Sequence, residues 1–128
     1  MAKSNAKGRS KKASFVALPK YLINSEKYQS LRGNSIKLLT QIAEQYNGGN
    51  NGDLQASFSV LKDKGWKSSG TLDTAKKELI SCGFIVKTRQ GHFPKTCSLF
   101  ALTWALVDKS DKYDSQVYVG KVIGTWRD

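Results

Sequence analysis

The chain contains few of the residues on which enzyme chemistry most often depends. Its 128 residues include two cysteines, Cys82 and Cys97, and one histidine, His92. The cysteines lack C-x-x-C spacing and have no second histidine, so the pattern does not predict a structural zinc site. The ten acidic residues do not cluster as the carboxylates of a two-metal nuclease do. No Walker lysine follows the glycine-rich stretch 48–52. We therefore expect a protein that is not an enzyme and that holds no metal or cofactor.

Long apolar runs are also absent from the sequence. No run approaches the roughly 20 residues that a helix needs to cross a bilayer. The first residues are basic but include no apolar stretch of the kind found in a signal peptide. Two isolated cysteines are typical of a reducing compartment. These absences predict a cytoplasmic protein without a membrane partner.

Positive charge is abundant. Lysine and arginine number 21 against ten acidic residues, which gives a formal net charge of +11. Between residues 57 and 97 there are eight basic residues and three acidic ones, whereas basic and acidic residues balance from 98 onward. Cations that neutralise phosphates release counterions and so strengthen association. The charge therefore favours a nucleic acid as partner.

The first 13 residues add five basic residues and no acidic one. Self-repulsion and the lack of apolar side chains predict a disordered basic arm over residues 1–13. Its function would be to bind phosphates, and the alternative is a segment that only aids solubility. The basic residues of this arm are Lys3, Lys7, Arg9, Lys11 and Lys12.

Residues 14–104 form the predicted folded domain. Pro19 favours the start of a short helix that reaches about Asn24. A second helix, capped by Asn34 or Ser35, would bury one apolar face and end before the turn 47–52. A short strand is predicted over residues 53–56. The residues expected on the buried face are Ile36, Leu38, Leu39, Ile42, Ala43 and Tyr46.

The segment 57–104 predicts two helices followed by a β-hairpin. Ser57 is the expected N-cap of a short helix that ends at Gly65, and Trp66 is expected to pack inward. Ser68 would cap a longer helix over residues 69–82, with Leu72, Ala75, Leu79 and Cys82 facing the core. Strands over 84–89 and 98–104 would then enclose a loop around Gly91. This order is a helix-turn-helix followed by a two-stranded wing.

Residues 105–128 are predicted to be an extension that packs either on the domain or on a partner. Residues 108–115 read as a charged loop, and residues 117–119 and 121–123 as strands or an extended tail. Trp126 is large and amphipathic, which suggests a packing contact. The side chains offered for a contact with a second copy or another protein are Tyr113, Tyr118, Val119, Ile123 and Trp126.

Several short motifs run through residues 15–104. They include Leu18-Pro19, the turn from Tyr46 to Leu54 with its glycines and asparagines, and Gly65-Trp66-x-Ser68. Gly83-Phe84-Ile85, Thr88-Arg89-Gln90-Gly91 and Leu102-Thr103-Trp104 follow. With these motifs the chain resembles the winged helix-turn-helix domains of proteobacterial phages, plasmids and integrated elements. The resemblance implies an α+β fold, mainly α, in the cytoplasm of a bacterial host. It also implies a role in transcription regulation or replication.

A winged helix-turn-helix usually places its second helix in the major groove of DNA. Here that helix would be 69–82, with the wing on the adjacent backbone and Lys62 and Lys64 beside the groove. The helix has no arginine and no outward asparagine or glutamine, so we expect modest sequence preference. The predicted DNA contacts are Lys67, Ser68, Ser69, Thr71, Thr74, Lys76, Lys77, Arg89, His92 and Lys95.

Two hypotheses follow for function. The first is a non-enzymatic duplex-DNA-binding protein of a mobile element, and proteins of this kind are usually two-fold dimers on a palindromic site, which leaves a homodimer as one possible state of this chain. The alternative is a phage-encoded interaction protein that inhibits a host nucleoprotein complex, such as a CRISPR effector (an anti-CRISPR role). Binding to RNA is a weaker third hypothesis, because few exposed aromatic residues are evident for stacking on bases.

Overall fold

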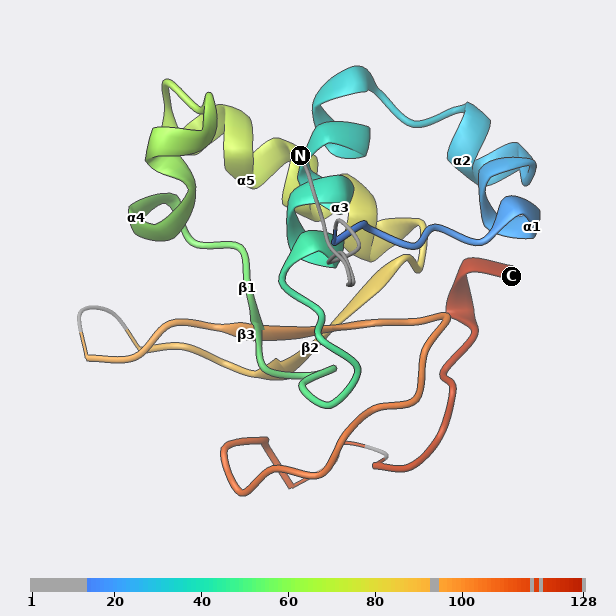
Figure 1. Ribbon diagram of the computed structural model, residues 1–128. Helices are drawn as coiled ribbons and strands as arrows, with labels where there is room; N and C mark the ends of the chain where they lie inside the picture. The colour runs from blue at the N-terminus through green and yellow to red at the C-terminus, as the bar shows by residue number, and fades with distance from the viewer. Residues whose placement is uncertain (1–13, 93–94, 116, 118, 128) are drawn as a thin grey trace, which may run out of the picture.

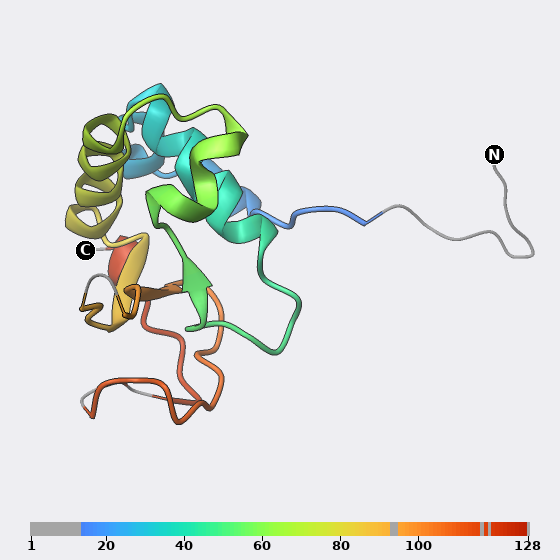
Figure 2. The same ribbon diagram turned by 90° about the vertical axis from the view of Figure 1, so that its left-hand side faces the viewer.

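The structure is a computed structural model that describes residues 14–92, 95–115, 117 and 119–127 (Figure 1). These residues form an α+β fold with a small antiparallel sheet of strand order β1-β3-β2. In Figures 1 and 2 the helices lie on one side of the sheet, and the chain that follows β3 runs along the other side. The fold class predicted from the sequence is thus confirmed at the level of α+β.

The helices and strands predicted for residues 19–104 are all present, and their ends differ from the prediction by at most three residues. The short helix α2 was not predicted. In chain order the described elements are α1 (Lys20–Ile23), α2 (Glu26–Gln29), α3 (Gly33–Glu44), β1 (Leu54–Gln55), α4 (Phe58–Leu61), the 3-10 helix η1 (Lys62–Lys64), α5 (Ser69–Ser81), β2 (Ile85–Arg89), β3 (Leu99–Leu102) and the 3-10 helix η2 (Thr125–Arg127).

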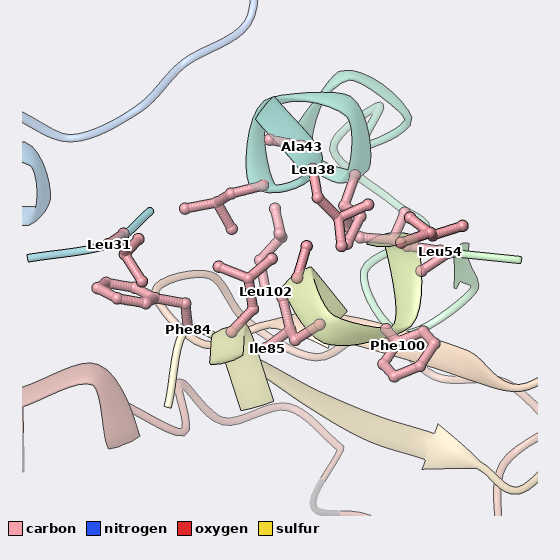
Figure 3. Packing of buried hydrophobic residues seen from close by; sticks show 14 of the residues in the cluster. Leu31, Leu38, Ala43, Leu54, Phe84, Ile85, Phe100 and Leu102 are labelled. Carbon is pink, nitrogen blue, oxygen red and sulfur yellow. The ribbon is translucent and has the colours of Figure 1, made fainter. Parts of the chain in front are cut away.

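The core lies where α3 and α5 pack against each other and over the sheet (Figure 3). Apolar residues recur at three- and four-residue steps on both helices, which gives each helix one apolar face. Ile36 and Tyr46, which were predicted to face the core, pack against it and are half-buried, and Ser35 is also buried. The fully enclosed side chains include Leu38, Leu39, Ile42, Leu72, Leu79, Phe84, Ile85 and Leu102.

A polar contact between α3 and α5 explains the burial of Ser35. One carboxylate oxygen of Glu78 accepts hydrogen bonds from the Ser35 hydroxyl at 2.5 Å and from the Arg32 backbone N–H at 3.1 Å. Arg32 is therefore the N-cap residue of α3, and the predicted capping by Asn34 or Ser35 is wrong. The cause is a contact from α5, 43 residues further along the chain than Ser35.

The turn between α4 and α5 agrees with the prediction. Gly65 has a φ of 90°, the left-handed conformation that ends η1. Trp66 is only 4% exposed, and its Nε1 donates to Oε1 of Gln41 at 2.6 Å. Ser68 caps α5, because its hydroxyl accepts a hydrogen bond from the Thr71 backbone N–H at 3.2 Å. The Gly65 conformation and these two hydrogen bonds fix the direction in which α5 leaves the turn.

The C-terminal segment, residues 105–127, is held to the domain at two ends. Near its start, the buried Asn51 side chain donates to the carbonyls of Leu102, Ala105 and Leu106. At its far end Trp126 is 7% exposed, belongs to the core cluster and stacks on Tyr21 with 5.4 Å between ring centroids. No strand forms in the described part of 117–123, where Val122 makes one isolated bridge with Leu106. The segment is therefore an extended chain that packs on its own domain.

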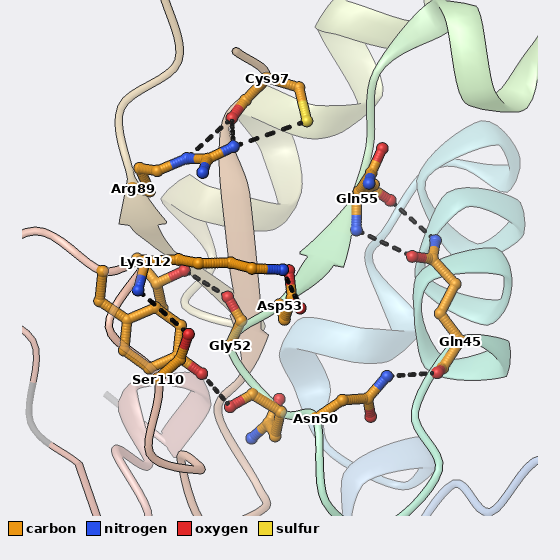
Figure 4. A network of polar contacts seen from close by, with 12 residues as sticks. Gln45, Asn50, Gly52, Asp53, Gln55, Arg89, Cys97, Ser110 and Lys112 are labelled. Atoms are coloured by element: carbon orange, nitrogen blue, oxygen red, sulfur yellow. Dashed lines mark hydrogen bonds and ion pairs between the residues drawn. The ribbon is translucent and has the colours of Figure 1, made fainter.

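Polar groups from other segments form hydrogen bonds with backbone groups at the outer edges of β1 and β2. The Gln45 side-chain amide bonds both backbone groups of Gln55 in β1, donating to its carbonyl at 2.8 Å and accepting from its N–H at 2.8 Å (Figure 4). At β2, the Asp114 backbone N–H donates to the Thr88 carbonyl at 2.8 Å. The Asp114 carboxylate accepts from the Gln90 N–H at 2.9 Å. The C-terminal segment thereby fixes the point where β2 enters the loop to β3.

Tyr113 connects this segment to the turn after α3. Its hydroxyl donates to the Asn51 carbonyl at 3.1 Å. Partial burial raises the pKa of the Tyr113 phenol above its ordinary value, and the carboxylates of Asp53 and Asp108 raise it further. Tyr113 thus joins the C-terminal segment to the domain, and its contact with another chain stays a prediction.

Candidate nucleic-acid interface

The outward face of α5 is polar and exposed. Leu72, Ala75 and Leu79 point into the core, and Cys82 packs against it half-buried at the end of the helix, as predicted. Because the helix repeats every 3.6 residues, the opposite side carries small polar and charged side chains. The exposed residues of this face are Gly70, Asp73, Thr74, Lys77 and Ser81.

The start of α5 combines capping and exposed groups. The Ser68 hydroxyl accepts from the Thr71 backbone and donates to the Thr71 hydroxyl at 2.9 Å, so both hydroxyls are engaged in the cap. Lys67 and Ser69 flank this cap and are exposed. Of the residues predicted to contact DNA here, Lys67 and Ser69 are therefore the more available, and Ser68 mainly holds the helix start.

A cleft of about 560 Å³ lies between α5 and the β2–β3 hairpin. We call it the wing-side cleft, after the hairpin predicted to be the wing. Lys76 of α5 and Lys95 of the β2–β3 loop both line it, although the sequence separates them by most of a hairpin. The Lys76 side chain is 21% exposed, lies 3.5 Å from the Asp73 carboxylate, and approaches the Phe100 ring at 5.9 Å. The lining residues are Ser57, Ser59, Lys76, Gly91, Lys95, Thr96, Cys97, Ser98 and Phe100.

The wing residues predicted as DNA contacts differ in their surroundings. Arg89 is half-buried, and its guanidinium donates twice to the Cys97 carbonyl, at 2.7 and 3.2 Å, across the hairpin (Figure 4). Arg89 therefore links the two sides of the β2–β3 hairpin. His92 and Lys95 are exposed, and the His92 carbonyl accepts from the Lys95 N–H at 3.0 Å. In Figure 2, α5 and the loop between β2 and β3 lie on the same side of the molecule.

A second cleft, of about 240 Å³, lies on the other side of α5 against the start of α3. We call it the α3-side cleft. Arg32 lines it with an exposed guanidinium whose Nε lies 3.8 Å from Oε2 of Glu78. Sequence reasoning missed Arg32, since no local spacing relates it to α5. The lining residues are Arg32, Asn34, Ser35, Thr71, Thr74 and Ala75.

Other predicted contacts lie at the margins or beyond the described residues. Lys62 and Lys64 are exposed on η1, and Lys64 pairs with Glu44 at 3.5 Å. The basic arm, with Lys3, Lys7, Arg9, Lys11 and Lys12, lies outside the described residues. The segment 14–19 that follows the arm leaves the fold on the side of α3 away from α5 (Figure 2).

Within the part of the chain that the structure describes, no three histidine, cysteine or acidic side chains gather as metal ligands would. Cys82 and Cys97 are both free and half-buried. None of the described helices combines the length and the apolar character needed to cross a membrane.

Comparison with known proteins returns no match: no family model, no curated protein and no solved structure is similar to this chain.

Proposed function

We propose that this chain is a winged helix-turn-helix protein that binds duplex DNA and has no enzymatic activity of its own. The observation that carries the proposal is the exposed polar face of α5, which lies between two clefts that each contain a cationic side chain. In this proposal α4 and α5 are the helix-turn-helix, and the β2–β3 hairpin is the wing.

The arrangement suits the major groove, which is about 12 Å wide and admits one α-helix. A helix in the groove has a phosphate backbone on each side. Lys76 and Lys95 lie beside α5 on the wing side, and Arg32 lies beside it on the α3 side. Cations on both sides of a polar helix therefore match the charge of the groove and its two borders.

The cellular role is proposed from the resemblance stated for residues 15–104. A DNA-binding protein of a bacterial mobile element would act in transcription regulation or replication. Lys77 is the basic residue on the outward face of α5, next to small hydroxyl side chains. Small hydroxyls and one lysine discriminate bases less than paired arginine or asparagine contacts do. We therefore expect binding dominated by phosphate contacts, with modest sequence preference.

The first test is fluorescence anisotropy with a labelled random duplex over a series of salt concentrations. The wild-type chain should bind at low salt with an affinity that falls steeply as salt rises. In the double variant Lys67→Glu, Lys77→Glu, affinity should fall at least about tenfold, since two cations beside phosphates become anions. Both lysines are exposed, so the substitutions leave the core intact. Lys76 is unsuitable because it packs beside Phe100.

The matched control is the double variant Lys20→Glu, Lys109→Glu, which changes net charge equally at exposed positions on α1 and the C-terminal segment. It should lose much less affinity. Equal losses in the two double variants would contradict an interface on α5, and no binding by the wild type at low salt would contradict the function.

An exposed apolar surface favours the alternative, an interaction protein that binds a host nucleoprotein complex. Phe15 is 87% exposed and lines an apolar groove of about 530 Å³ with Tyr46 and Trp104. Such apolar exposure marks protein contacts. If this alternative holds, Phe15→Asp should abolish capture of the host complex without changing the affinity for duplex DNA.

A further inference from the structure

The α3-side cleft places an arginine beside the DNA-facing surface of α5. Arg32 and Asn34 come from the start of α3, and Thr71 and Thr74 from α5. From these positions we infer that Arg32 binds a backbone phosphate of the DNA strand that borders α5 on the side away from the wing. The inference rests on the proposed function and adds a contact that the α5–wing interface lacks.

Position around α5 supports this assignment. Thr71 and Glu78 are seven residues apart and therefore share one edge of the helix, the edge that meets α3. Lys76 lies on the opposite edge and lines the wing-side cleft. Arg32 and Lys76 thus flank the outward face from its two sides. A side chain that borders the helix in this way meets the backbone next to the groove rather than a base edge.

The Arg32 side chain is free to change partner without disturbing the fold. It is 75% exposed, and the ion pair that it makes within the described part of the chain, with Glu78 at 3.8 Å, is too long for a good hydrogen bond. The shorter bonds to Glu78 come from the Arg32 backbone and the Ser35 hydroxyl. The guanidinium can therefore turn to a phosphate while the backbone of Arg32 stays bound to Glu78.

The chemistry favours arginine at this place. A guanidinium donates two parallel hydrogen bonds to a phosphate, which fixes geometry as well as charge. The exposed face of α5 offers lysine but no arginine. Arg32 would supply the oriented contact, and with Lys76 and Lys95 across the helix it would fix the angle and depth of α5 in the groove.

The test compares Arg32→Gln, Arg32→Lys and the charge-matched control Lys109→Gln in the same duplex titrations. Arg32→Gln should lower affinity about tenfold and reduce the slope of log affinity against log salt by about 0.9, the value for one lost phosphate contact. Arg32→Lys should restore the slope but only part of the affinity, because lysine lacks the guanidinium fork. Lys109→Gln should change both quantities little.

The failure of this inference can be told from the failure of the proposed function. If Arg32→Gln behaves like Lys109→Gln while Lys67→Glu, Lys77→Glu loses binding, the Arg32 contact is wrong and DNA binding through α5 stands. An altered sequence preference with an unchanged salt slope would indicate a base contact and also overturn the phosphate assignment. If neither α5 nor Arg32 variants change binding, both proposals fail.

Thermal unfolding of each variant checks the fold. If Arg32→Gln lowers the melting temperature, Arg32→Lys decides the question, since it keeps a cation near Glu78. Reduced affinity with the wild-type salt slope in Arg32→Lys supports the contact, and wild-type affinity contradicts it.

Discussion

Asn51 connects the turn after α3, the end of β3 and the start of the C-terminal segment through one buried side chain. Its amide nitrogen donates to three carbonyls at 3.0 to 3.1 Å, and its amide oxygen accepts from the Leu102 N–H at 2.7 Å. Asn51 is fully buried, so water does not replace its bonds to the buried Leu102 backbone groups, which depend on Asn51 for their partner.

Replacing Asn51 with alanine should therefore destabilise the fold strongly. The change leaves the buried Leu102 N–H and nearby carbonyls without partners, and we expect a loss of about 3 kcal/mol in the free energy of unfolding. Urea denaturation followed by circular dichroism measures it. The control is Asn47→Ala in the same turn, whose side chain is exposed. Similar losses in both variants would contradict the role given to Asn51.

At the scale of elements, the pairing of α3 with α5 combines an apolar seam with one carboxylate. The Ser35 hydroxyl is the main reason why the pKa of Glu78 lies below its ordinary value of 4.5, and the Arg32 backbone and guanidinium lower it further. Partial desolvation acts in the opposite direction. The charged form of Glu78 thus stabilises the contact that positions α5.

A lowered pKa in the folded state means that the carboxylate stabilises the protein above the pKa of the unfolded chain. This stabilisation disappears as the pH falls through the lower folded pKa. Glu78→Gln should therefore be less stable than wild type at pH 7, by about 1 kcal/mol. The difference should shrink as the pH falls below the ordinary Glu78 pKa of 4.5. Denaturation curves of both proteins between pH 3 and 7 test this. A difference that stays constant with pH would contradict it.

At the scale of the whole molecule, the C-terminal segment returns the chain to its beginning. Trp126 stacks on Tyr21 of α1, and Gly83 at the end of α5 lies so close to Thr125 that a Cβ would be 2.4 Å from the Thr125 carbonyl oxygen. The first helix, the end of α5 and the last residues therefore form one packed region.

Trp126→Ala should lower stability by about 3 kcal/mol, as expected when a large buried aromatic side chain is removed. Affinity for duplex DNA should stay unchanged at temperatures where the variant is folded. Calorimetry and anisotropy on the same preparation measure both quantities. A variant with wild-type stability would show that the last residues do not contribute to the core.

Local patterns were sufficient to predict much of this fold. Gly65, Trp66 and Ser68 determine the turn before α5 through their own conformations and caps, and the apolar spacing of α5 fixes its outward face. The contacts that sequence reasoning missed join distant residues. The contact of Glu78 with the Arg32 backbone lies at the start of α3, and Arg32 lies beside α5 only because the two helices pack together.

Arg89 shows the same limit within the candidate interface. A basic residue at the end of a strand predicts a solvent-exposed contact, yet the hairpin brings the Cys97 carbonyl within 2.7 Å of its guanidinium. The sequence gives no sign of that pairing, because it depends on the register of β2 with β3, which shifts between Lys87 and Arg89.

The hydrogen bonds that Gln45 and Asp114 make with β1 and β2 also affect how copies of the chain behave together. Strands at the rim of a sheet are templates on which a second chain can add and begin a fibril. Here the side-chain amide of Gln45 occupies one rim in place of a neighbouring peptide, and Asp114 occupies part of the other. Concentrated solutions should consequently resist strand-to-strand aggregation even when salt screens the net charge of +11.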